Sequence, residues 1–360
     1  MRPRAALGRL GAASLACALA LAGISACAGG GSQPTATRTA VKTDPKEPPP
    51  PLPDTWPLTG EFGEVVERAA LSVKIENTAP ARPQTGLEQA DVIWEEMIEG
   101  GESRFIAVYN SIVPERVGPV RSVRPMDGPI LGATHGLLAC SGGQDRFIAK
   151  AREAGLQVFT EDFKGYFRSE DRRMPYNLYL RPAEIWAQAD VSHQALPLGE
   201  FVFAPSDAAV TAQVEGTPAD GLDVAISTTA RPGWTFQKES GLYLRSERGT
   251  PSMAASGTRL SASNVIALEV AVEFAGGTDS AGSPIPDTQI VGSGKGIVAA
   301  GGKAVEVEWS KKDVSSPIVL RPAAGGDVRL AIGQTWVELV PAGEGSWTVL
   351  APEPSPDPED

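Results

Sequence analysis

Apolar and polar residues alternate along two neighbouring stretches, Asp91–Glu99 and Ser103–Ser111. This period of two predicts β-strands, because successive side chains of a strand point to opposite faces of a sheet. Gly100 and Gly101 separate the stretches, where a hairpin turn favours glycine. Both faces of each stretch carry apolar residues, so we expect a hairpin at the centre of a sheet rather than at its edge.

Shorter signals surround this hairpin between residues 58 and 205. Two apolar runs predict further buried strands, Ala70–Ile75 and Leu137–Ser141. Three segments are candidates for short helices: Asp127–Thr134, Gln144–Ala154 and Ala183–Ala189. Strands interleaved with helices indicate a mixed α/β N-terminal domain over residues 58–205.

After a small and polar stretch at residues 204–221, the period becomes two almost throughout. Ten segments alternate in this way: Leu222–Ser227, Trp234–Gln237, Leu242–Arg245, Asn264–Phe274, Thr288–Val298, Lys303–Trp309, Pro317–Leu320, Asp327–Ala331, Trp336–Val340 and Trp347–Leu350. Many short strands at regular spacing predict a β-rich C-terminal domain over residues 222–350, an antiparallel sandwich or barrel. The expected fold class is therefore α+β.

The first 26 residues have the features of a signal peptide. Three arginines precede an apolar run, Leu10–Ala26, which is shorter than the roughly 20 residues that a membrane-spanning helix needs. The run ends at Ile24-Ser25-Ala26-Cys27, which resembles the lipobox of bacterial lipoproteins. We predict cleavage before Cys27 and lipidation of its thiol. The alternative is an ordinary secretory signal with an incidental cysteine.

The chain ends differ in composition from the parts expected to fold. Residues 27–57 are rich in Gly, Ser, Thr and Pro and are predicted to form a tether between membrane and folded body. Residues 351–360 form an acidic, Pro-rich tail with no apolar residue pattern to pack. These segments favour a lipid-anchored protein at the cell membrane that faces the extracytoplasmic side.

The charge of the chain argues against nucleic acid as a partner, and the setting of Cys140 argues against a reactive thiol. The net charge is −12, and the predicted cleavage removes three arginines and no acidic residue, which makes the mature chain still more acidic. Such a chain is a poor nucleic-acid binder, because binding to phosphates needs clustered Lys and Arg. Cys140 lies in an apolar run and is expected to be a small buried residue rather than a nucleophile.

Acidic residues gather in the predicted hairpin: Glu95, Glu96, Glu99 and Glu102. Hydrolysis of a glycosidic bond needs two carboxyl groups on opposite sides of that bond, one of them kept protonated by its environment. Strand alternation would put Glu95 and Glu99 on one face and Glu96 on the other. The alternative is a structural network of these carboxylates with nearby arginines.

Arginines are the second candidate group. Arg104 lies in the second predicted strand, and Arg121 and Arg124 follow in a loop bounded by Pro119 and Pro125. Proline fixes φ, so this loop would hold both guanidinium groups in place, as recognition of a carboxylate or phosphate requires. Ligand binding and internal pairing with the glutamates are both open.

The remaining motifs predict no cofactor and no metal site. Gly292–Gly296 lacks both the upstream glycine and the Ser or Thr of a phosphate-binding loop. His135 and His193 have no partners at zinc-ligand spacing, and no Gly-x-Ser-x-Gly elbow supplies a serine nucleophile. Tryptophans of the second half are expected in the core or, alternatively, along a sugar groove: Trp309, Trp336 and Trp347.

Several ordered motifs carry a family resemblance: Val73–Asn77, Ala81–Leu87, Gln89–Val92, Glu99–Gly101, Ser103–Phe105, Gly118–Pro125, Leu260–Val265, Gly292–Gly296, Trp309–Lys311 and Gly333–Pro341. They resemble the YerB-like lipoproteins, the family of the DUF3048 domain. Phe167-Arg168 and Arg172–Asn177 also look like the family's Arg…Ala-Pro-His-Asn segment, which adds Arg168 and Asn177 to the candidate binding residues. The resemblance implies a two-domain bacterial surface lipoprotein and carries no established activity.

One departure from the family pattern bears on catalysis. This chain has Tyr176 where the family usually has histidine. Tyrosine, with an unperturbed pKa of about 10, would not replace histidine as a general base at neutral pH. We therefore expect a non-enzymatic module of the cell envelope that binds a ligand, an envelope polymer or an envelope protein. The alternative is a carboxylate-dependent hydrolase that acts on envelope polymer.

Overall fold

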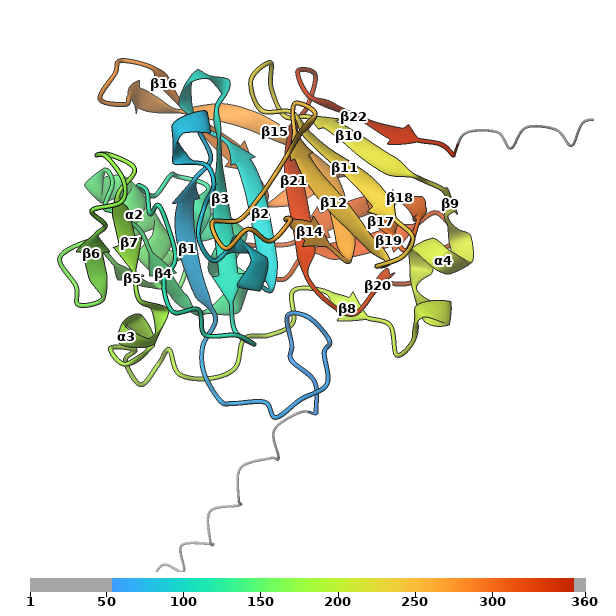
Figure 1. Cartoon of the computed structure of the whole chain (residues 1–360), viewed down its shortest axis with the longest axis horizontal. Helices are drawn as coiled ribbons and strands as arrows, with labels where there is room; N and C mark the ends of the chain where they lie inside the picture. Colours follow the sequence, from blue (N-terminus) through green and yellow to red (C-terminus); the bar gives the residue numbers. More distant parts are fainter. Residues whose placement is uncertain (1–53, 353–360) are drawn as a thin grey trace, which may run out of the picture. The chain divides into compact units, whose positions relative to one another are not determined.

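The computed structural model describes residues 54–352 (Figure 1). The predicted signal peptide, Cys27 and nearly all of the predicted tether and tail lie outside the described residues. Strands dominate the described part, which confirms the predicted β-rich character. Its α-helices are short, so the first half does not form a clearly mixed α/β domain: α1 Asp127–Leu131, α2 Asp145–Glu153, α3 Pro182–Trp186 and α4 Thr211–Glu215.

A sheet of twelve strands extends through both halves of the sequence. Its main order is β19–β18–β17–β15–β21–β2–β3–β1–β4–β5, with β16 paired to β15 and β9 paired to β18. The strands have these bounds: β1 Leu71–Glu76, β2 Val92–Met97, β3 Ser103–Tyr109, β4 Leu137–Ala139, β5 Gln157–Phe159, β9 Thr217–Pro218, β15 Asn264–Thr278, β16 Pro284–Gln289, β17 Gly292–Ala300, β18 Lys303–Lys311, β19 Val319–Pro322 and β21 Thr335–Pro341.

The predicted hairpin is present as β2 and β3, and its position is central because β21 pairs with the other side of β2. Gly100 and Gly101 form the turn with φ of 71° and 75°, a region that other residues rarely adopt. The strand ends at Met97, two residues earlier than predicted, and Glu99 begins a 3-10 turn. Strand alternation therefore does not determine the direction of the Glu99 side chain.

A second sheet of six strands packs on the face of the central sheet that carries Ile93 and Phe105. Its strands are β10 Gly221–Ala225, β11 Pro232–Gln237, β12 Leu242–Glu247, β13 Thr250–Pro251, β14 Ser261–Ala262 and β22 Ser346–Leu350. Trp234 and Trp336 meet edge to face between the two sheets, with ring centroids 5.2 Å apart. This aromatic contact lies at the centre of the core that the sheets share.

Helices α1 and α2 contact each other, and their apolar residues join the core on the opposite face of the central sheet. The helix predicted at Gln144–Ala154 is present as α2, and its Phe147 and Ala151 are buried. Two small sheets complete the fold: β6 Tyr166–Arg168 with β7 Leu178–Leu180, and β8 Val202–Phe203 with β20 Arg329–Leu330. The single strand predicted at Thr288–Val298 is wrong, because the chain turns between β16 and β17.

The two halves of the sequence join through parallel strand pairs. Strand β2 pairs with β21 from Val92↔Thr335 to Glu95↔Glu338, and Figure 1 shows the two side by side. Strand β8 of the first half also pairs with β20 of the second half in parallel. A domain boundary near residues 204–221 remains a prediction, but β2 and β21 belong to one continuous hydrogen-bonded sheet.

This junction predicts that the halves depend on each other for folding. A fragment of residues 58–205 would expose the β2 edge and the apolar face around Ile93 and Phe105, which favours aggregation. We expect the full chain to unfold cooperatively and the fragment to show no cooperative transition, as measured by thermal unfolding followed by circular dichroism. A well-dispersed amide NMR spectrum of the isolated fragment would contradict this.

Candidate functional site

Neighbouring glutamates of β2 point to opposite faces of the central sheet and enter separate polar clusters. Glu95 contacts Arg245 of the second sheet, whereas Glu96 contacts Lys74 of β1. Both glutamate side chains are 0% exposed. The predicted acidic cluster is therefore divided by the sheet, and neither of these two carboxyl groups reaches solvent.

The cluster of Glu96 lies on the face covered by α1. Lys74 Nζ forms ion pairs with Glu96 Oε1 and, at 2.8 Å, with Asp127 Oδ1. Burial raises the pKa of Glu96 to about 8, and the neighbouring Asp127 adds to the rise while Lys74 opposes it. With one cation and two carboxyl groups in a buried space, the protonated form of Glu96 leaves Lys74 and Asp127 as a balanced pair.

An open pocket of about 440 Å³ adjoins this cluster, and we call it the arginine pocket. Its lining residues come from the sheet, the loop after β3, α2 and the β15–β16 hairpin: Glu76, Thr78, Ile98, Glu99, Glu102, Arg104, Arg121, Ser122, Arg124, Gly143, Gln144, Phe147, Tyr176, Asp279, Ser280 and Ile285. Four predicted site residues thus meet here: Glu99, Arg104, Arg121 and Arg124.

Two carboxylates hold the three guanidinium groups of the arginine pocket. Glu76 Oε2 lies 2.5 Å from Arg121 Nε and 3.4 Å from Arg104 Nε. Glu99 Oε2 accepts a hydrogen bond of 2.8 Å from Arg124. Glu99 therefore lies in the arginine pocket and not beside Glu95, where strand alternation had predicted it.

The electrostatics of the pocket reflect this crowding of cations. Burial lowers the pKa of Arg104, and the nearby Arg124 lowers it further, while Glu76 acts in the opposite direction. Burial by itself would raise the pKa of Glu76, but Arg104 and Arg121 outweigh burial and hold that pKa below its usual value. Glu76 therefore stays ionised, and its carboxylate holds Arg104 and Arg121 in place.

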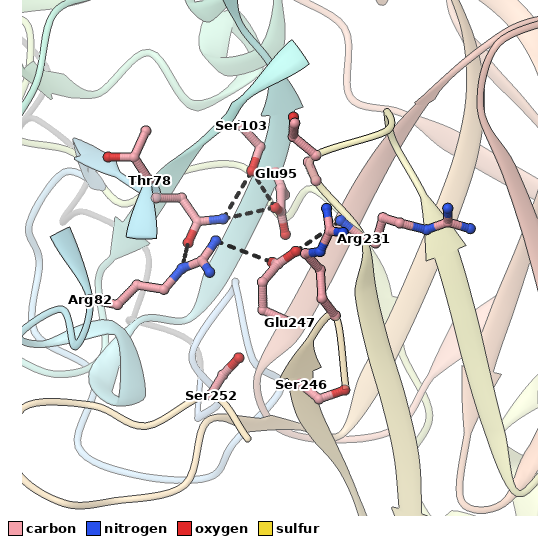
Figure 2. A network of polar contacts seen from close by, with 12 residues as sticks. Thr78, Arg82, Glu95, Ser103, Arg231, Ser246, Glu247 and Ser252 are labelled. Atoms are coloured by element: carbon pink, nitrogen blue, oxygen red, sulfur yellow. Dashed lines mark hydrogen bonds and ion pairs between the residues drawn. The ribbon is translucent and has the colours of Figure 1, made fainter. Parts of the chain in front are cut away.

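The other face holds a network centred on Arg245, and Figure 2 shows its members Glu95, Ser103 and Glu247 from close by. Arg245 donates hydrogen bonds to Glu95 at 2.7 Å and to Glu247 at 3.0 Å. Glu95 also accepts hydrogen bonds from Asn77 at 3.0 Å and Ser103 at 2.6 Å. Both carboxylate oxygens of Glu95 therefore accept hydrogen bonds from other side chains of the buried core.

Glu338 of β21 completes this network. Trp234 Nε1 donates a hydrogen bond of 2.9 Å to its carboxyl group. Burial raises the pKa of Glu338 well above its usual range, and the adjacent Glu95 adds to the rise. Burial would lower the pKa of Arg245, but the carboxylates of Glu95 and Glu247 outweigh it and raise that pKa.

A second pocket of about 410 Å³ opens above the Arg245 network. Its walls include apolar side chains: Pro83, Pro251, Met253 and Leu260. Arg82 lies at its side and pairs with Glu247 at 3.5 Å, as the dashed line in Figure 2 marks. The network therefore connects the loop after β1 with the second sheet.

The other predicted residues lie apart from these clusters. Arg168 donates a hydrogen bond of 3.1 Å to Asn177 and pairs with Glu161 at the surface. Tyr176, by contrast, lines the arginine pocket, with Arg121 5.7 Å from the centre of its ring. Burial raises the pKa of Cys140 to about 11, which disfavours a thiolate.

Some members of the clusters were not identified from the sequence: Lys74, Asp127, Arg245, Glu247 and Glu338. A signal was present, because Lys74 and Glu338 are single charges within apolar strands. Within residues 54–352, no group of three His, Cys, Asp or Glu side chains has the arrangement of a metal site. No helix in this range is long and apolar enough to span a bilayer.

Comparisons with known proteins agree on one family. Residues 58–195 match the family described as "Protein of unknown function (DUF3048) N-terminal domain", and residues 222–337 match its C-terminal domain. The chain is 28% identical over 296 residues to the Bacillus subtilis (strain 168) protein named "Putative lipoprotein YerB", covering 79% of this chain and 86% of that protein. The crystal structure of YerB from Bacillus subtilis has a TM-score of 0.68 at 24% identity, covers 82% of this chain and 99% of that chain, and shows the shared fold.

The buried carboxyl groups predict a specific pH dependence of stability. Glu96 is protonated in the folded state up to a pH of about 8, whereas in the unfolded chain it loses its proton near 4.5. Its contribution to the free energy of unfolding is therefore fully present below pH 4.5 and falls as the pH rises to about 8, by at most about 1.4 kcal/mol per pH unit.

Glu96→Gln resembles the protonated form at every pH and is therefore expected to remove this pH dependence of stability. The difference in free energy of unfolding between wild type and variant, measured by urea denaturation from pH 5 to 8, should shift in favour of the variant as the pH rises. The exposed Glu273→Gln serves as the matched control and should show a constant difference. A constant difference for Glu96→Gln would show that this carboxyl group does not bind a proton on folding.

Proposed function

Because this chain belongs to the DUF3048 family and its Bacillus subtilis relative is named a lipoprotein, we propose that it is a lipid-anchored binding module of the cell envelope. In this proposal Cys27 carries the anchor and the folded body faces the extracytoplasmic side. The arginine pocket then holds an anionic group of an envelope ligand. The family itself has no assigned activity, so the ligand class rests on the site.

The pattern of ion pairs on the pocket wall, rather than its net charge, carries this proposal. Three guanidinium groups converge there, and within residues 54–352 two carboxylates, Glu76 and Glu99, form ion pairs with them. Glu102 and Asp279 also line the pocket, but among the described residues neither pairs with these arginines. A bound carboxylate or phosphate would relieve the crowding of Arg104, Arg121 and Arg124.

The pocket is also built to hold these groups in place. Arg124 N–H donates a hydrogen bond of 2.9 Å to Asp127, which is itself paired with buried Lys74. Arg121 is 26% exposed, so its guanidinium group is fixed by Glu76 yet accessible to a ligand. A preorganised arginine loses less conformational entropy when it binds an anion than a mobile one would.

The alternative of a carboxylate-dependent hydrolase has less support from the pocket. A general acid needs a raised pKa and contact with the substrate. Glu96 and Glu338 have raised pKa values but are fully buried, whereas the pKa of Glu76 in the pocket is lowered. The glutamates with a raised pKa therefore do not contact the pocket, and the glutamate with a lowered pKa does.

Replacement of Arg121 tests the binding proposal. We expect Arg121→Gln to weaken binding of an anionic envelope fragment about tenfold or more, since a hydrogen bond to a charged group contributes about 1.5–3 kcal/mol. Calorimetric titration of the full chain in detergent would use two probes, peptidoglycan fragments with free carboxylates and phosphate-containing teichoic-acid fragments. The two probes distinguish the source of the anion.

The matched control is Arg181→Gln, which removes an exposed arginine that also pairs with one glutamate but lies outside the pocket. It should bind as the wild type does. Absence of wild-type binding to both probes, or equal affinity of wild type and Arg121→Gln, would contradict the proposal. Release of shorter wall fragments during these incubations would instead favour the hydrolase.

The anchor can be tested separately. We expect Cys27→Ser to abolish labelling of the full chain with radioactive palmitate and to reduce its amount in the membrane fraction of a bacterial host, because the acceptor thiol is lost. Cys17→Ser, within the predicted signal peptide, is the control and should still be labelled. Unchanged labelling of Cys27→Ser would refute the anchor.

A further inference from the structure

A groove of about 520 Å³ lies over β17, β18 and β19, and it shares no lining residue with the arginine pocket. Side chains of three neighbouring strands form its floor, and Trp347 of the second sheet lines it as well. We propose that this groove binds a neutral glycan strand. The inference is independent of the anion site proposed above.

The floor of the groove presents charges of alternating sign. Lys295, Glu308 and Arg321 lie directly opposite one another on the three strands, which are spaced about 4.8 Å apart. Glu306 precedes Glu308 by two residues, on the same strand face and about 7 Å away. These two cations and two anions carry no net charge, and Glu269 and Asp327 beside the cations add negative charge, which favours a neutral ligand over an anionic polymer.

Lys295 pairs with Glu269 at 3.3 Å, but the two glutamates of the floor are free to bind hydroxyl groups. Among the described residues, Glu306 and Glu308 are exposed and make no ion pair or side-chain hydrogen bond. Arg321 has Asp327 3.8 Å away, which is too far for a hydrogen bond. An apolar ligand would cover these groups without satisfying them, whereas a polyhydroxylated ligand supplies both donors and acceptors.

Trp347 supplies the apolar part of the groove. The other two tryptophans considered for a sugar groove are buried in the core: Trp309 and Trp336. Trp347 is partly exposed, and a large aromatic surface next to polar groups suits the apolar C–H faces and polar edges of a sugar ring.

The shape of the groove indicates a polymer rather than a single sugar. A neighbouring hollow of about 270 Å³ shares Lys295, Glu308 and Arg321 with it. Together the two hollows follow β17 from Gly296 to Ser293 and β18 from Glu306 to Ser310. A linear glycan strand would contact both hollows.

The proposal is tested with chitohexaose, a neutral linear glycan, in calorimetric titrations of the full chain in detergent. We expect wild type to bind and Trp347→Ala to bind about tenfold more weakly or worse, because the aromatic contact is lost. Since Trp347 also packs on the core, a double variant, Glu306→Gln with Glu308→Gln, keeps the side-chain volume and is expected to weaken binding about threefold or more.

Glu273→Gln, an exposed strand glutamate outside the groove, is the matched control and should bind like wild type. Arg121→Gln should also bind chitohexaose normally, so failure of the anion site is distinguishable from failure of the groove. Absence of wild-type binding would overturn the proposal. So would wild-type affinity in a double variant with an unchanged melting temperature.

Discussion

The guanidinium group of Arg245 holds the two halves of this protein together. It extends from the second sheet to Glu95 on β2, beside Glu338 on β21, and these are the strands that pair across the two halves. A buried charge is costly unless it is paired and hydrogen-bonded. Loss of one partner would leave an uncompensated charge in the core, at a cost of about 3–5 kcal/mol. The fold therefore depends on this network being complete.

A second buried cluster, around Lys74, lies behind β2 on the opposite face of the sheet. Because Glu95 and Glu96 are consecutive strand residues, one segment of backbone positions both clusters. The Lys74 cluster also supports the arginine pocket, since Asp127 binds both Lys74 and the backbone N–H of Arg124. The backbone at Arg124 is thus tied to the buried core, and such support is what the proposed anion site would need for specific binding.

Local patterns predicted most strands correctly, because burial of one or both faces leaves a period of two in the sequence. The hairpin β2–β3 and helix α2 were predicted within a few residues. The patterns failed where a short turn interrupts an otherwise continuous alternation, as between β16 and β17. They also failed for Glu99, because the strand ends before it and the 3-10 turn directs its side chain to Arg124.

The sequence alone identified the family, and it singled out the charged residues of the hairpin and the following loop as candidates. Charges placed among apolar residues mark positions that need a partner, and this is visible without coordinates. The tertiary structure decided which partner each charge has. Glu95 pairs with Arg245, 150 residues away, and lies beside Glu338, and such pairings depend on strand order, which local periodicity does not encode. Only the assembled sheet could therefore separate the fully buried carboxyl groups of β2 from the arginines that line a pocket.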